Sequence, residues 1–242
     1  MKRIFISDLH LDETSPELAQ SFFDFLAKYC QDIDELYILG DFFEVWLGDD
    51  NVSPFNQSVI EALSRLTCKV YIMHGNRDFL IGQSFCQAAN VSLLDDPTIV
   101  ELASGPALLI HGDSLCTNDV GYIKARSILR SKDFQEDFLS KPIVEREAIA
   151  KQIRGESEQL TRETADDIMD VTPEEVVKVM QDNEVRVLIH GHTHRPAVHR
   201  VDLGDFTGKR FVLGDWHTSM QYLEADDDKI SLKLWECTHA QQ

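Results

Sequence analysis

The stretch Leu36-Tyr37-Ile38-Leu39-Gly40-Asp41-Phe42-Phe43-Glu44 decides how the rest of this chain is arranged. A short apolar run followed by a turn is typical of a buried strand in an α/β sheet. Asp41 follows that strand directly, at the carboxyl end where open sheets bind their ligands. One carboxylate in this position can contact two metal ions at once, so we expect Asp41 to bridge a pair of ions.

Four other predicted strands end in side chains that bind metals: Asp8 with His10, Asn76, His111, and His192 with His194. Because neighbouring strand ends face one crevice, we expect these side chains to meet. We predict that one ion is held by Asp8, His10, Asp41 and His194. The other is predicted to be held by Asp41, Asn76, His111 and His192. Oxygen and imidazole ligands without cysteine suit manganese, iron or zinc, with the ions about 3.5–4 Å apart.

A pair of metal ions at this spacing predicts chemistry on phosphate esters. Two cations acidify a bridging water to hydroxide near neutral pH and clamp the oxygens of a phosphoryl group. Arg77 follows Asn76, and a guanidinium there would bind a phosphate and stabilise charge on its oxygens. The alternative for Arg77 is a structural ion pair with Asp78. Asp41 and Arg77 are therefore the predicted catalytic residues.

Several polar residues in or near the motifs are not predicted to bind metal. Glu44 and Asp113 are better placed to orient histidines. Three further histidines are interpreted as surface or packing residues: His199, His217 and His239.

The first half of the chain predicts parallel strands joined by helices. Apolar runs alternate with helical spacing, a rhythm typical of β-α-β units with crossover helices. The strands are predicted at 3–7, 36–39 and 69–73, and the helices near 15–29 and 55–67.

The second half predicts a further sheet. A hairpin is expected at 98–102 and 107–110, and the capping-box pattern Thr172-Pro173-Glu174-Glu175 predicts the start of a helix. Antiparallel strands that close the second sheet are predicted at 198–201, 210–213 and 229–235. We therefore expect an α/β fold of two packed sheets flanked by helices.

Composition limits the class of protein. The 242 residues suit a single domain, 1–242, with a sizeable insertion. A formal net charge of −19 argues against binding to nucleic acid backbones. Five cysteines without a Cys-x-x-Cys pattern favour a reducing compartment. Neither a signal peptide nor a membrane-spanning run is predicted, so we expect a cytoplasmic protein.

Residues 118–168 carry no strand signal and predict two or three helices inserted over the site. Between 122 and 162 there are nine basic and seven acidic residues, interspersed with large apolar side chains. An apolar, locally basic lid over a metal site would suit an acylated, phosphorylated sugar and a membrane surface. The alternative is a small helical subdomain whose apolar residues pack on one another.

The motifs together resemble the calcineurin-like metallophosphoesterase superfamily. More narrowly, they resemble its branch that hydrolyses UDP-2,3-diacylglucosamine in lipid A biosynthesis. Protein phosphatases and diadenosine tetraphosphatases of the superfamily usually show Asp-Arg-Gly after Gly-Asp, and Gly-Asn-His-Glu in the third motif. Here Phe42-Phe43-Glu44 and Gly75-Asn76-Arg77-Asp78 stand instead. The narrower resemblance is carried by segments 8–11, 40–50, 74–79, 111–117 and 189–199.

The resemblance implies cleavage of the substrate's pyrophosphate by water attack on the uridine-side phosphorus, with two Mn²⁺ ions per chain. The products would be UMP and 2,3-diacylglucosamine 1-phosphate (lipid X). It also implies peripheral attachment to the cytoplasmic side of the inner membrane, without a protein or nucleic acid partner. The implied substrate contacts are Asn76, Arg77, Asp119, Ser157, Thr161, Thr164 and His192. Arg154 matches a family arginine, whereas Thr161 and Thr164 stand where the family more often carries asparagine and lysine.

Two other functions remain open from the sequence. A soluble nucleotide phosphodiesterase of the same superfamily would need the same metals but no apolar lid. A non-catalytic scaffold with this fold should have lost some metal ligands, whereas every ligand position is filled here.

Overall fold

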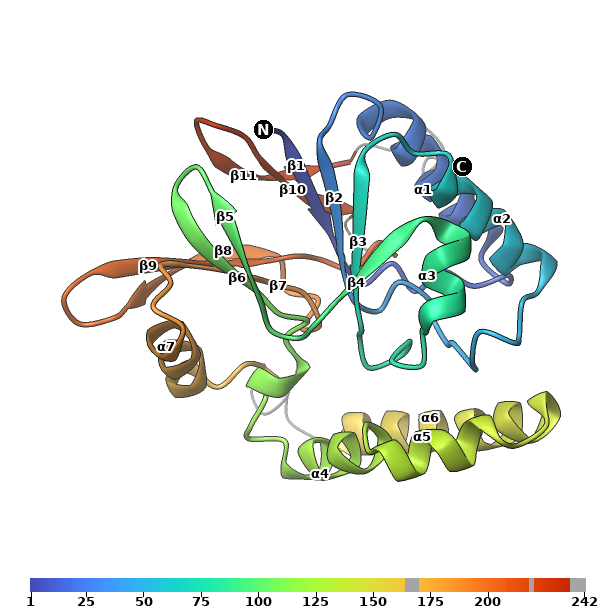
Figure 1. Ribbon diagram of the computed structural model, residues 1–242. Helices are drawn as coiled ribbons and strands as arrows, with labels where there is room; N and C mark the ends of the chain where they lie inside the picture. Colours follow the sequence, from blue (N-terminus) through green and yellow to red (C-terminus); the bar gives the residue numbers. More distant parts are fainter. Residues whose placement is uncertain (164–169, 218–219, 236–242) are drawn as a thin grey trace.

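The computed structural model describes residues 1–163, 170–217 and 220–235, and two sheets form its centre (Figure 1). The first sheet has the order β11-β10-β1-β2-β3-β4. Its parallel strands are β1 (Arg3–Ile6), β2 (Glu35–Leu39), β3 (Lys69–Met73) and β4 (Val91–Leu94). The hairpin of β10 (Gln221–Ala225) and β11 (Ile230–Leu234) continues this sheet antiparallel to β1.

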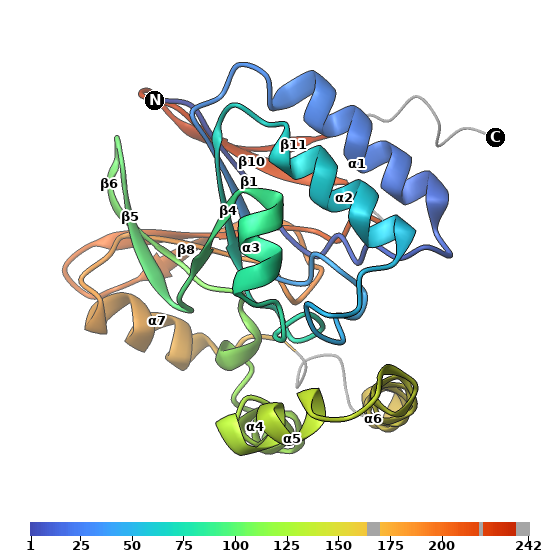
Figure 2. The same ribbon diagram turned by 45° about the vertical axis from the view of Figure 1, so that its right-hand side comes forward.

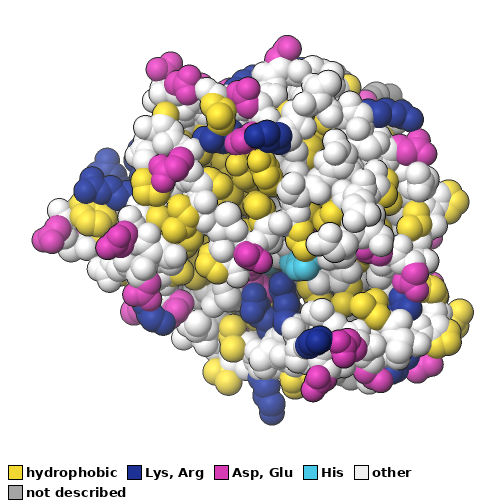
Figure 3. Space-filling view, in the orientation of Figure 1, with side chains coloured by type: hydrophobic (Ala, Val, Ile, Leu, Met, Phe, Trp, Pro, Cys, Tyr) yellow, Lys and Arg dark blue, Asp and Glu magenta, His cyan; other side chains and the backbone are white. Residues whose placement is uncertain are grey.

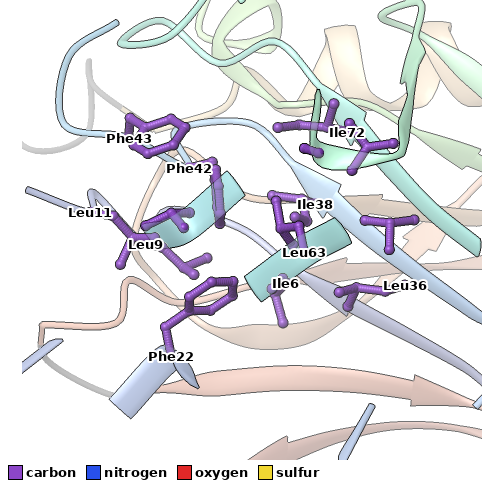
Figure 4. Packing of buried hydrophobic residues seen from close by; sticks show 14 of the residues in the cluster. Ile6, Leu9, Leu11, Phe22, Leu36, Ile38, Phe42, Phe43, Leu63 and Ile72 are labelled. Carbon is purple, nitrogen blue, oxygen red and sulfur yellow. The ribbon is translucent and has the colours of Figure 1, made fainter. Parts of the chain in front are cut away.

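Three helices cover the outer face of the first sheet: α1 (Pro16–Tyr29), α2 (Pro54–Ser64) and α3 (Gln83–Ala89) (Figure 2). Alternate strand side chains such as Ile6 and Ile38 point to this face because successive residues of a strand face opposite sides. They pack with Phe22 of α1 and Leu63 of α2 (Figure 4). Each fully buried side chain of this size contributes about 1.5–3 kcal/mol of burial free energy.

The second sheet has the order β5-β6-β7-β9-β8. Its strands are β5 (Thr98–Leu102), β6 (Gly105–Leu109), β7 (Val187–His190), β8 (Ala197–Asp202) and β9 (Thr207–Val212). Phe5 and Leu39 of the first sheet share an apolar cluster with Leu109 and Phe211 of the second, so the sheets pack face to face. Helix α7 (Pro173–Asp182) covers the outer face. This arrangement confirms the predicted two-sheet α/β fold.

Two predictions about individual elements are wrong, and two strands were not predicted. The strand expected at 229–235 is β11, which lies in the first sheet because the β10–β11 hairpin pairs with the open edge of β1. Strands β4 and β10 carry no clear alternation and were not predicted. The capping box at Thr172 does not form, since its hydroxyl lies 2.8 Å from that of Thr117 and makes no capping bond to the backbone.

Helices α4 (Val120–Leu129), α5 (Lys132–Leu139) and α6 (Ile143–Glu163) occupy the predicted insertion. In Figure 1 they lie together below the two sheets. Asp119 begins α4 by accepting a hydrogen bond from the Tyr122 N–H at 2.8 Å. No helix in the described parts of the chain is long and apolar enough to cross a membrane.

Candidate metal centre

The first group of candidate ligands brings together two segments far apart in the sequence. Asp8 and His10 follow β1, and His194 follows β7. The Nε2 atoms of His10 and His194 lie 3.3 Å apart, and His194 Nε2 lies 3.4 Å from Asp8 Oδ1. Corners of a tetrahedron with bonds of about 2.1 Å have this spacing, so the three atoms could surround one cation.

The second group combines Asp41 after β2, His111 after β6 and His192 after β7. Asn76, which follows β3, lies between the two histidines. Its Oδ1 is 3.0 Å from His111 Nε2 and 2.9 Å from His192 Nδ1. The four side chains predicted for the second ion are therefore together in space.

Asp41 lies between the two groups. Its Oδ1 accepts a hydrogen bond from the Arg77 N–H at 2.8 Å, which fixes the carboxylate. Its Oδ2 lies 3.9 Å from His10 Nε2 and 3.8 Å from His111 Nε2, one nitrogen from each group. One oxygen of Asp41 is thus in the position that a bridging ligand requires.

Five of the candidate ligands have positive φ angles between 50° and 67°: Asp8, His10, Asp41, His192 and His194. Such angles are uncommon outside glycine and collect at functional sites, where the surrounding structure maintains them. Backbone hydrogen bonds supply that support here. Asp8 N–H donates to Gly40 O at 3.1 Å, and His10 N–H donates to Asp41 O at 2.9 Å.

Two motif glycines allow the ligand loops to pack closely. A Cβ on Gly75 would lie 2.1 Å from Asp41 N, and a Cβ on Gly191 would lie 2.1 Å from Asp8 Oδ2. Any side chain at either position would push a ligand carboxylate out of place. Close packing against the ligand carboxylates therefore explains why glycine precedes both Asn76 and His192.

The electrostatics of these side chains fit a site for cations. Burial raises the pKa of Asp41. Burial opposes protonation of His111, but the carboxylates of Asp41 and Asp113 raise its pKa to about 9. Burial and the nearby His111 lower the pKa of His192 to about 4. Divalent cations would compensate the buried carboxylates and match the nitrogen atoms directed at common points.

The residues around the ligands differ in part from expectation. Glu44 Oε2 lies 2.9 Å from His10 Nδ1, as expected of a residue that orients a histidine. Asp113 accepts hydrogen bonds from Tyr122 Oη and Arg126 Nε, both at 2.7 Å. Among the described residues it has no hydrogen bond or ion pair with a histidine, which contradicts its predicted role.

Arg77 does not pair with the neighbouring Asp78. The Asp78 carboxylate instead accepts hydrogen bonds from the Phe42 and Gly75 N–H groups at 2.7 and 2.8 Å. The Arg77 guanidinium is half-buried, with Nη1 3.9 Å from Glu44 Oε1. The alternative role in that ion pair is excluded, and the guanidinium remains beside the ligands.

A cavity of about 240 Å³ lies between the insertion and the core. Its apolar walls include Trp46 and Phe79 from the core and Leu129, Phe134 and Ile153 from the insertion. Polar side chains reach it from both sides: Asn76, Arg77, Asp119, Arg126, Arg130 and Arg154. In Figure 3 a histidine is visible in a hollow between the sheets and the insertion, with Lys and Arg side chains beside it.

The predicted substrate contacts are only partly described. Asn76, Arg77 and Asp119 line the cavity. His192 belongs to the second ligand group, and its ring centroid is 5.8 Å from that of Tyr122. The side chains of Ser157 and Thr161, and the whole of Thr164, lie outside the described residues.

Sequence reasoning missed the residues that follow β9. Asp215 and His217 line a groove together with His10 and His194, and the His217 ring centroid is 6.4 Å from that of His10. The interpretation of His217 as a surface or packing residue overlooked this position. A signal was present, because Gly214-Asp215 after a strand repeats the pattern of Gly40-Asp41.

Comparison with known proteins agrees with this fold. Residues 1–196 match the family Calcineurin-like phosphoesterase. The chain therefore belongs to the calcineurin-like phosphoesterase family, whose members bind metal ions. A solved structure described as a novel archaeal phosphodiesterase has a TM-score of 0.50 at 14% identity, covering 97% of this chain and 100% of that one, which supports the shared fold.

Two relatives with much higher sequence identity share the same name. A protein of Pseudomonas fluorescens (strain SBW25) named UDP-2,3-diacylglucosamine hydrolase is 48% identical over 241 residues, covering 98% of this chain and 97% of its own. A protein of Marinobacter nauticus with the same name is 47% identical, covering 95% of each chain.

Proposed function

We propose that this protein hydrolyses the pyrophosphate of UDP-2,3-diacylglucosamine to UMP and 2,3-diacylglucosamine 1-phosphate, a step of lipid A biosynthesis. One observation carries the proposal. The candidate ligand Asn76 lines a largely apolar cavity that several arginines also line, in a chain similar over nearly its whole length to proteins named for this substrate. An acylated sugar diphosphate needs an apolar surface for its acyl chains and a cationic surface for its phosphates.

The reaction assigns roles to the residues around the centre. Two divalent cations, for which manganese is our choice, would supply an activated water and neutralise charge on the phosphoryl oxygens when bound. The Asp41 carboxylate is held by the Arg77 N–H in a position to serve both ligand groups. Glu44 restrains the His10 ring from its other nitrogen.

Arg77 and Arg154 would bind the diphosphate. Both line the apolar cavity and also the groove beside His10 and His194. Arg154 additionally forms an ion pair with Glu44, which directs its guanidinium towards the ligands. A guanidinium matches phosphate oxygens with two parallel donors and stabilises the charge that develops during hydrolysis.

The insertion would act as a lid that binds the acyl chains. Its cavity-facing side chains include the apolar Leu129, Phe134 and Ile153, and α4 and α6 also expose Val120, Ile128 and Val144 to solvent. Exposed apolar side chains next to lysines such as Lys124 and Lys151 suit the surface of an anionic membrane. We therefore place the enzyme peripherally on the cytoplasmic side of the inner membrane, where an acylated substrate resides.

The test is to incubate the purified protein with Mn²⁺ and UDP-2,3-diacylglucosamine in mild detergent and to identify the nucleotide by mass spectrometry. UMP should appear with metal and be absent with a chelator. UDP would mean cleavage at the sugar carbon and contradict the proposed bond. UDP-N-acetylglucosamine is the matched substrate without long acyl chains, and we expect its kcat/KM to be at least about 100-fold lower because it leaves the apolar cavity unfilled. Equal rates would favour a soluble nucleotide phosphodiesterase.

A further inference from the structure

A polar groove of about 650 Å³ lies against the first ligand group and has no role in the function described so far. Its walls include His10 and His194, and beyond them Asp12, Thr14, Ser15, Asp215 and His217. We propose that this groove binds the nucleoside half of the substrate. The proposal rests on the function proposed above and adds a site for the part of the substrate that the lid does not hold.

The groove and the apolar cavity are connected. The groove and the apolar cavity share three lining residues: Glu44, Arg77 and Arg154. A diphosphate held by the two arginines has one substituent on each side. The cavity accounts for the acylated sugar, because its walls are mainly apolar. The nucleoside then extends into the hollow on the other side of the arginines.

The side chains of the groove match the polar groups of a nucleoside. Uridine presents ribose hydroxyls, one N–H donor, two carbonyl acceptors and a flat ring. Carboxylates at Asp12 and Asp215 can accept from the ribose hydroxyls, and the hydroxyl of Ser15 can donate to a carbonyl of the base. The exposed ring of His217 provides a surface for stacking on the base.

The groove is held in shape by local contacts. Asp12 Oδ1 accepts from the Thr14 N–H at 2.8 Å and from its hydroxyl at 2.5 Å, which orders the turn before α1. Ser15 precedes α1, but its hydroxyl makes no capping bond to that helix. Nearby, Trp216 N–H donates to Asp8 O at 3.2 Å, so the segment that carries Asp215 and His217 is attached to the first ligand group.

This placement also orders the two phosphates. The groove borders His10 and His194, whereas the cavity borders Asn76 of the second group. A nucleoside in the groove therefore brings the uridine-side phosphorus towards the first group. The sugar-side phosphate is then nearer to Asn76, and water attack on the uridine-side phosphorus leaves the acylated product in the lid.

The test uses UMP as a probe and two substitutions in the groove, His217→Ala and Asp12→Asn. UMP inhibition is measured on the Mn²⁺-loaded enzyme during hydrolysis of bis(p-nitrophenyl) phosphate, a substrate without a nucleoside. We expect each variant to raise the inhibition constant of UMP about tenfold while inhibition by inorganic phosphate changes less than about twofold. The KM for UDP-2,3-diacylglucosamine should rise with the UMP constant, and kcat should change much less. His199→Ala, at an exposed histidine of β8, is the matched control and should leave the UMP constant unchanged.

The outcomes separate this inference from the function on which it rests. If the wild type releases UMP but neither groove variant changes UMP inhibition, the groove assignment is wrong and the proposed function stands. If UMP inhibits no better than inorganic phosphate, the groove does not bind the nucleoside. If UDP-2,3-diacylglucosamine is not hydrolysed but UMP inhibition still depends on His217 and Asp12, the groove is a nucleotide site and the proposed substrate is wrong.

Discussion

The metal centre and the helical insertion are attached to the same sheets in different ways. The candidate ligands lie on short loops joined by backbone hydrogen bonds, with glycines such as Gly75 allowing contacts that no side chain would permit. The insertion is attached to the core by side chains: Phe138 packs in the apolar core cluster, and three arginines form ion pairs. Arg126 pairs with Asp113, Arg146 with Asp50, and Arg154 with Glu44.

The arginine contacts divide into two kinds. Arg146 is 4% exposed and donates to both oxygens of Asp50 and to the backbone carbonyls of Leu47, Leu139 and Lys141. Its role is to attach the insertion at a distance from the candidate ligands. Arg126 and Arg154 instead contact carboxylates next to the ligands. Backbone packing therefore fixes the centre, whereas apolar and charged side chains fix the lid, so substitutions can affect one without the other.

The largest expected effect is on the centre. Asp41→Asn replaces one oxygen of the carboxylate by an amide nitrogen and removes the charge that both ligand groups share. We expect kcat/KM to fall by at least about 10³-fold, or about 4 kcal/mol of transition-state stabilisation. Bound metal, measured by elemental analysis, should fall as well. The exposed Asp228→Asn is the matched control, and near-normal activity in Asp41→Asn would contradict a bridging role.

Steric contact at the centre gives the next prediction. Gly75→Ala places a Cβ against Asp41 N, so we expect the free energy of unfolding to fall by about 3 kcal/mol. Gly155→Ala is the same substitution in α6, where no described atom outside the helix's own backbone lies within 4 Å of the new Cβ. It should stabilise the insertion by up to about 1 kcal/mol, since alanine favours a helix. Chemical denaturation measures both, and equal effects would contradict the contrast between the two regions.

Sequence patterns predicted the centre better than its surroundings for a physical reason. The end of a strand can be predicted from where an apolar run stops. Asp8, Asn76 and His111 each follow such a run, so they could be predicted to meet before their contacts were known. The positive φ angles of the ligand residues have no sequence signal, because these residues are not glycines. The pairing of Arg126 with Asp113 and of Arg146 with Asp50 depends on how the insertion packs. Helical spacing predicts that a helix forms but does not predict which core residue it contacts.

The same reasoning explains the errors in the sheets. Strands β1, β2 and β3 are apolar runs in the middle of a sheet and were predicted. Strand β4 lies at an edge, where exposed Ser92 and Leu93 interrupt the burial pattern. Strand β11 lies at the opposite edge of the same sheet. It pairs with β10, and β10 pairs with β1, which precedes it by more than 200 residues in the sequence. Long-range pairing of this kind is absent from any local pattern.

A third prediction separates the lid from the centre. Arg146→Ala removes the bonds to the core at Asp50 and at the Leu47 carbonyl, so we expect the attachment of the insertion to weaken by about 2 kcal/mol. Hydrogen exchange should increase in α5 and α6 while the strands stay protected. The KM for UDP-2,3-diacylglucosamine should rise more than that for bis(p-nitrophenyl) phosphate. A parallel loss of both activities would show that the lid and the centre are not separable. Arg146→Lys should not restore the attachment, because an ammonium cannot reproduce the planar set of donors.

The smallest expected effect is a pH dependence of the same attachment. Hydrogen bonding to Arg146 holds the pKa of Asp50 below its usual value of 3.8. A carboxylate whose pKa is lowered by folding contributes stability above its unfolded pKa, and that contribution is lost as the pH falls through the folded value. The difference in stability between wild type and Asp50→Asn should therefore be constant near neutral pH and decline below 3.8. Urea denaturation of both proteins between about pH 3 and pH 7 measures it, and titration of the metal ligands cancels in the difference. A difference that does not change with pH would mean that Arg146 acts through the backbone carbonyls alone.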